Sequence, residues 1–139
     1  SMYGNTEKMA DAIARELSVA GIKNIKIYDA SKTHMSYMIN DIFKYKCLII
    51  GSCAYNNELF PAVESLVTEI EHKGIKDRYL GIFGSFSWNG GGVKNLLKFA
   101  DNIGWEMIGN PVEVKGALSE EKYAEIQLLA KEISEKMSK

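Results

Sequence analysis

The first ten residues combine hydroxyl side chains, a glycine and the start of a helix. Ser1 and Thr6 carry the hydroxyls, Gly4 between them allows a tight turn, and an apolar pattern of helical spacing begins at Met9. The first N–H groups of such a helix have no partner within it, and the helix dipole adds partial positive charge there. This turn therefore predicts an anion site suited to phosphate.

The type of phosphate follows from what the turn lacks. A Walker loop would place a lysine after its glycine, whereas Gly4 is followed by Asn5 and Thr6. A singly attached phosphate monoester, held without metal, is therefore favoured over ATP. The alternative is that Asn5 or Thr6 simply caps a helix. The ten residues alone leave both interpretations open.

Composition restricts the class of protein. The chain has 139 residues and a net charge of -1, which suits one domain, 1–139, with its own core. It has no basic stripe for nucleic acid and no apolar run that could span a membrane. Cys47 and Cys53 do not form a disulfide framework and fit a reducing cytosol, so a cytoplasmic location is expected. His34 and His72 lie in no ligand cluster, so we expect no metal site built by the protein.

Helix and strand patterns alternate along the chain. Helices are predicted near 6–20, 33–43, 61–73, 93–100 and 119–137. Strands are predicted at 22–28, 46–52, 79–83 and 107–114. Pro111 places the last strand at an edge. This alternation predicts an α/β fold, with a parallel sheet covered by helices on both faces and right-handed crossovers.

The predicted sheet is one strand short. A phosphate loop should follow a strand, but the chain starts at the loop, so five helices accompany four strands. We therefore expect the first strand of the sheet to lie upstream of Ser1 or to be missing from this chain.

Three loops are expected at one edge of the sheet, outside the carboxyl ends of the strands, where open parallel sheets bind ligands. These loops are 1–6, 52–60 and 84–92. Tyr55 in the second loop and Trp88 in the third can flank a flat ring, although ordinary packing is the alternative for each. Ser85 and Ser87 can hold sugar hydroxyls. FMN, with a phosphate, a polyol and a flat heterocycle, fits all three loops.

The three loops together resemble the flavodoxin family. The stretch from Ser1 to Ile13 is similar to the phosphate-loop signature of flavodoxins. The closer resemblance is to the flavodoxin-like domain of flavodiiron proteins, also called A-type flavoproteins or rubredoxin:oxygen oxidoreductases. The similar stretches are 3–10, 51–57 and 84–91, and the likeness runs over the whole chain.

The resemblance implies a flavodoxin-like, doubly wound parallel sheet of order 2-1-3-4-5 that binds FMN non-covalently. Residues 1–6 would take the phosphate, and residues 53–57 and 85–90 would flank the ring. The implied cofactor-binding residues are Ser1, Met2, Tyr3, Gly4, Asn5, Thr6, Cys53, Ala54, Tyr55, Asn56, Asn57, Ser85, Phe86, Ser87, Trp88, Asn89 and Gly90. No catalytic residue is expected.

Three functions remain open. The first is an FMN electron-transfer domain of a flavodiiron-type flavoprotein, a redox module whose partner is another redox protein or a preceding diiron domain. The second is a free-standing flavodoxin or an FMN-dependent NAD(P)H:quinone reductase, the latter typically completed across a subunit interface, as in a homodimer. The third is a degenerate interaction domain without flavin. The net charge of -1 favours a tethered domain, because free flavodoxins are strongly acidic and use that charge in docking.

Overall fold

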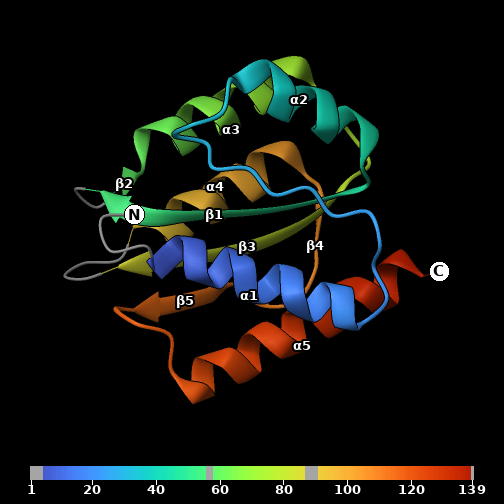
Figure 1. Ribbon diagram of the computed structural model, residues 1–139. Coiled ribbons are helices and arrows are strands. Elements are labelled where there is room, and N and C mark those ends of the chain that lie inside the picture. Colours follow the sequence, from blue (N-terminus) through green and yellow to red (C-terminus); the bar gives the residue numbers. More distant parts are fainter. Residues whose placement is uncertain (1–4, 56–57, 87–90, 139) are drawn as a thin grey trace.

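Helices cover both faces of a central sheet in the computed structural model, which describes residues 5–55, 58–86 and 91–138 (Figure 1). The helices are α1 (Asn5–Val19), α2 (Met35–Lys44), α3 (Pro61–Lys73), α4 (Gly92–Ile103) and α5 (Glu120–Met137). The strands are β1 (Cys47–Tyr55), β2 (Glu58–Leu59), β3 (Tyr79–Phe86), β4 (Glu106–Met107) and β5 (Val112–Lys115). The five predicted helices and the α/β class are confirmed.

Strand β3 lies at the centre of the sheet. It pairs in parallel with β1 along one side, from Cys47 opposite Tyr79 to Cys53 opposite Ser85. Its other side pairs in parallel with β4 at the start and β5 at the end. The predicted strand 107–114 is therefore two short strands, interrupted where Gly109 has a positive φ of 66°. Both pair with β3 alone among the described strands, as expected for an edge.

Alternate side chains of β3 enter two separate cores, as expected for a strand buried on both faces. Leu80 and Ile82 pack with helices α2, α3 and α4, and Phe83 packs on the opposite face with α1 and α5. Trp105 packs in the core that contains Leu80 and Ile82, and its indole N–H donates to the Ile75 carbonyl at 2.9 Å. Because helices cover both faces of the sheet, the strands are continuous apolar runs in the sequence.

Residues 22–28 do not form the predicted strand. They run as an irregular segment between α1 and α2, and residues 23–28 make no backbone hydrogen bond within the described chain. A strand needs a neighbour with which to exchange hydrogen bonds, and no described strand pairs with this segment. Its alternating Ile25 and Ile27 are therefore not enough to form a strand.

The predicted loops at 52–60 and 84–92 begin later than expected. Strand β1 continues to Tyr55 and β3 to Phe86, because their pairing extends to Cys53 opposite Ser85. The short strand β2 then pairs back onto β1 in antiparallel fashion, with Ala54 opposite Leu59. Residues 52–55 and 58–59 of the first expected loop and residues 84–86 of the second are therefore strand.

Adjacent leucines on α4 provide a test of this packing. Leu96 is 0% exposed and Leu97 is 36% exposed. We expect Leu96→Ala to lower the free energy of unfolding by about 2–5 kcal/mol, because it leaves a core cavity. The matched variant Leu97→Ala should change it by less than about 1 kcal/mol in urea titrations followed by circular dichroism. Equal losses would contradict this assignment of faces.

The cysteine that begins β1 provides a second test. Burial raises the pKa of the Cys47 thiol to about 12, so almost no thiolate forms near neutral pH. We expect iodoacetamide at about pH 8 to leave Cys47 unmodified in the folded chain and to alkylate it in urea. Peptide mass mapping after each treatment measures this. Modification of Cys47 at equal rates in both states would show that the fold does not protect the thiol.

Candidate functional site

The start of α1, the end of β1 and the end of β3 meet at one edge of the sheet (Figure 1). Thr6 in the first turn of α1 lies 2.6 Å from Ser85 on β3, measured between the two hydroxyl oxygens. Cys53 on β1 is the register partner of Ser85. The described parts of the three predicted loops thus lie together at the carboxyl edge of the sheet, where parallel sheets place ligands.

The Thr6–Ser85 hydroxyl pair has donor capacity to spare. Each hydroxyl has one proton and two lone pairs, so one hydroxyl can donate to the other while the second proton remains for a ligand oxygen. If Ser85 donates, the Thr6 proton is left for a ligand oxygen, and Thr6 itself lies in the first turn of α1. A phosphate oxygen is a strong acceptor for both kinds of donor.

The capping interpretation does not describe Thr6. Helix α1 begins at Asn5, so Thr6 lies within the first turn and not at the position before it. Its hydroxyl bonds to a residue 79 positions later in the chain instead of to a neighbouring backbone N–H. Thr6 therefore connects a helix start to a strand end, which is a tertiary role.

Ser52 is a positioning residue whose role the sequence did not predict. It is 2% exposed, its hydroxyl donates to the Cys53 carbonyl at 2.8 Å, and it accepts the Phe60 N–H at 3.0 Å. These two bonds hold the end of β1 against the residue that precedes α3. Ser52 lies in the 51–57 stretch that resembles the family, but nothing in the sequence indicated that its hydroxyl would bind the Phe60 N–H.

Two glycines let the backbone pack closely at this edge. A Cβ at Gly84 would lie 2.8 Å from the Ser52 carbonyl oxygen, and a Cβ at Gly92 would lie 3.0 Å from the same atom. Any larger residue would push β3 or the start of α4 away from β1. The glycines therefore bring a second helix N-terminus, that of α4, to the edge that already holds α1.

Only part of the predicted site falls in the described chain. Cys53 and Ala54 are half-buried near the end of β1, Tyr55 ends that strand, and Phe86 is half-buried at the end of β3. Asn5 begins α1. Ten predicted residues lie outside the described chain: Ser1, Met2, Tyr3, Gly4, Asn56, Asn57, Ser87, Trp88, Asn89 and Gly90. Their roles stay predictions.

Other chemistries find little support in the described residues. Cys47 and Cys53 are both free thiols, and Cys47 lies at the opposite end of β1. Across residues 5–55, 58–86 and 91–138, no group of three His, Cys, Asp or Glu side chains could hold a metal ion. Among the helices in those ranges, none has the length and apolar character needed to cross a membrane.

Comparison with known sequences identifies relatives. The family model described as Flavodoxin matches residues 1–128. The rubredoxin-oxygen oxidoreductase of Megalodesulfovibrio gigas is 29% identical over 134 residues, covering 96% of this chain and 33% of that protein. The anaerobic nitric oxide reductase flavorubredoxin of Aliivibrio fischeri is 31% identical over 107 residues, covering 76% of this chain and 22% of that protein. The chain thus spans a third or less of the length of these relatives.

Solved structures give the same result. The rubredoxin oxygen:oxidoreductase from Desulfovibrio gigas superposes with a TM-score of 0.94 at 28% identity, over 99% of this chain and 34% of that chain. A flavodoxin from the domain Archaea superposes with a TM-score of 0.85 at 16% identity, over 100% of this chain and 94% of that chain, which supports the fold alone. The predicted resemblance to flavodoxins and to rubredoxin:oxygen oxidoreductases is confirmed. This chain belongs to the flavodoxin family, and that membership indicates FMN as its cofactor.

Proposed function

We propose that the chain is an FMN-binding electron-transfer domain of a flavodiiron-type flavoprotein. The observation that carries the proposal is the Thr6–Ser85 hydroxyl pair, which joins the N-terminus of α1 to the carboxyl edge of the β1–β3 sheet. This is where a terminal phosphate would meet hydroxyl and backbone donors together. Family membership and the oxidoreductase relatives support the same function.

The described residues fit FMN at its phosphate end. Thr6 would donate to a phosphate oxygen, Ser85 would orient Thr6, and the close packing at Gly84 and Gly92 would hold the strand ends in place. Bound FMN supplies the redox chemistry, and the protein binds it, orients it and tunes its potential. Residues 53–57 and 85–90 are proposed to flank the ring.

The physiological partner is proposed from the chain's relatives. Because the chain matches a third or less of their length, the rest of such a protein would contain the centre that exchanges electrons with the flavin. We propose a diiron domain in the same protein, or a separate redox protein, in that role. An NAD(P)H:quinone reductase is the competing proposal, and steady oxidation of NADH by the FMN-loaded chain would favour it.

The phosphate role of Thr6 is tested with two matched variants. We expect Thr6→Val to weaken FMN binding by about tenfold or more, because a hydrogen bond to a charged group is lost while side-chain shape is kept. Thr6→Ser retains the hydroxyl and should bind within about threefold of the unaltered chain. Quenching of flavin fluorescence during titration measures both. Equal affinity of the Val variant would remove Thr6 from the site.

The ring role of Trp88 is tested in the same titration. We expect Trp88→Ala to weaken FMN binding by about fivefold or more, because aromatic stacking beyond simple burial contributes about 1 kcal/mol. Tyr37→Ala is the control, since Tyr37 is 66% exposed on α2. If the unaltered chain binds no FMN, the flavin proposal is wrong and the interaction-domain alternative gains support.

A further inference from the structure

The Ser52 hydroxyl lies at the base of the hairpin that β1 and β2 form. Ala54 pairs with Leu59 in antiparallel fashion. Continued by one step, the same register places Cys53 opposite Phe60. The Phe60 N–H donates to the Ser52 hydroxyl at 3.0 Å, and that hydroxyl donates to the Cys53 carbonyl at 2.8 Å. The side chain therefore links the two backbone groups that would continue the ladder.

This hydroxyl has no proton left for a ligand. A backbone N–H can only donate, so the Ser52 oxygen accepts from Phe60 and its single proton goes to the Cys53 carbonyl. Ser52 is also 2% exposed. It differs in this from the Thr6–Ser85 pair, which keeps one proton for a ligand oxygen. Ser52 can therefore affect a ligand only through the backbone that it holds.

The hairpin that Ser52 closes is short. Strands β1 and β2 share two register pairs, and two paired strands alone are marginally stable in water. At the base of the hairpin, the Phe60 carbonyl accepts from the N–H groups of Val63 and Glu64 at 2.9 and 3.0 Å. Phe60 thus directs its carbonyl into α3 and its N–H to Ser52. Loss of the hydroxyl would loosen the end of β1 from the start of α3.

Two buried serines hold the same strand ends from opposite faces of the sheet. Ser52 is the register partner of Gly84, one row before Ser85, and side chains of successive rows point to opposite faces. Ser85 bonds to Thr6 of α1 on one face, whereas Ser52 bonds to the residue before α3 on the other. The first bond belongs to the proposed phosphate half of the site. The second holds residues 53–54, which are proposed to flank the ring.

We propose that Ser52 is a positioning residue for the flavin ring. Its hydroxyl holds the backbone of Cys53 and Ala54 in the arrangement that receives the ring, and it contributes nothing to phosphate binding. This role rests on the proposed function, because it assigns Ser52 to the ring half of an FMN site. A serine that only stabilised the fold would change the free energy of unfolding and leave the affinity of the folded chain for the ring unaltered.

The test compares FMN with riboflavin, which has the same ring and polyol but no phosphate. We expect Ser52→Ala to weaken the binding of both by about fivefold or more, and by the same factor, because a hydrogen-bonded link that preorganises the ring half is lost. Ser52→Thr keeps the hydroxyl and should recover most of the affinity. Thr6→Val should weaken FMN binding alone. Quenching of flavin fluorescence measures each dissociation constant.

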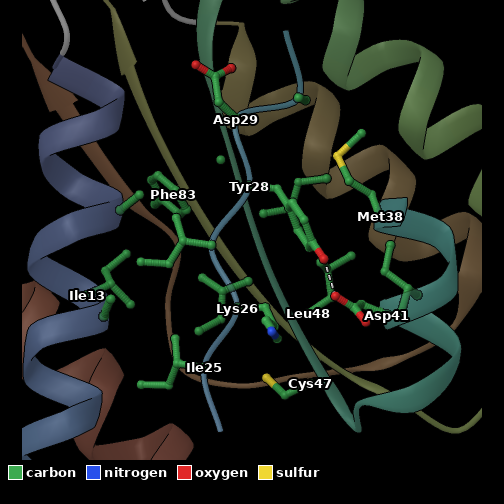
Figure 2. A pocket seen from close by; sticks show the side chains of 18 of the residues that line it. Ile13, Ile25, Lys26, Tyr28, Asp29, Met38, Asp41, Cys47, Leu48 and Phe83 are labelled. Atoms are coloured by element: carbon green, nitrogen blue, oxygen red, sulfur yellow. Dashed lines mark hydrogen bonds between the residues drawn. The ribbon is translucent and has the colours of Figure 1, made fainter. Parts of the chain in front are cut away.

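Leu48→Ala is the matched control. Leu48 lies on the same strand and the same face as Ser52, about 13 Å earlier along β1. It lines a cavity of about 570 Å³ that has α1 on one side and α2 on the other (Figure 2). Its truncation should lower stability against urea without changing either dissociation constant by more than about twofold. Circular dichroism checks that each variant keeps the helical signal of the unaltered chain.

A second measurement needs no flavin. Hydrogen exchange of the Phe60 amide reports its bond to Ser52 directly, and we expect Ser52→Ala to speed this exchange by about tenfold. Amides of α5, which packs on the opposite face of the sheet, serve as the reference and should exchange at the same rate in both proteins.

Five results would overturn the role of Ser52. Unchanged exchange at Phe60 would mean that the hydroxyl does not hold this backbone. Loss of FMN affinity without loss of riboflavin affinity would assign Ser52 to the phosphate half. Equal losses of affinity in Ser52→Ala and Leu48→Ala would reduce the effect to general stability. Full affinity of Ser52→Ala for both flavins would reject the ring role and leave the proposed function standing, whereas an unaltered chain that binds neither flavin would reject both.

Discussion

The parallel pairing of β1 with β3 is the interaction on which the rest of the structure depends. It positions Leu80 and Ile82 in one core and Phe83 in the other, so each face of β3 acquires a helical layer. The same register brings Cys53 opposite Ser85, which places the ends of both strands at one edge. Core and candidate site therefore depend on a single set of backbone hydrogen bonds, and loss of this register would remove both.

The candidate site shows how close packing serves binding. Gly84 and Gly92 allow backbone to lie against the Ser52 carbonyl, and Ser52 in turn holds the turn toward α3. The rigid strand ends leave Thr6 and Ser85 within hydrogen-bond distance. Donors held in this way need little reorganisation when an anion binds, which is the general advantage of a site built on strands and helix ends.

The two edges of the sheet differ in what lies beside them. Beyond β3, strands β4 and β5 occupy the edge in two pieces, broken near Gly109. Beyond β1, residues 47–52 face a cavity between two helical layers. An edge strand that is exposed to solvent can pair with water, but an edge inside an apolar cavity has much less access to it. Over residues 47–52, the edge of β1 that faces away from β3 thus has no strand partner within the described chain.

Sequence patterns alone determined the five helices and the α/β class, because apolar spacing and turn residues act locally. They also predicted that three loops meet at one edge of the sheet, and the described parts of those loops do so. The Thr6 hydroxyl and Ser85 were both singled out, yet only the tertiary structure paired them, since 79 residues separate them. Ser52 lies in a stretch that resembles the family, but only the tertiary structure shows that its hydroxyl accepts the Phe60 N–H. Residues 22–28 have a strand pattern but form no strand. A strand exists only where a neighbour exchanges hydrogen bonds with it, and that is a property of the fold and not of the segment.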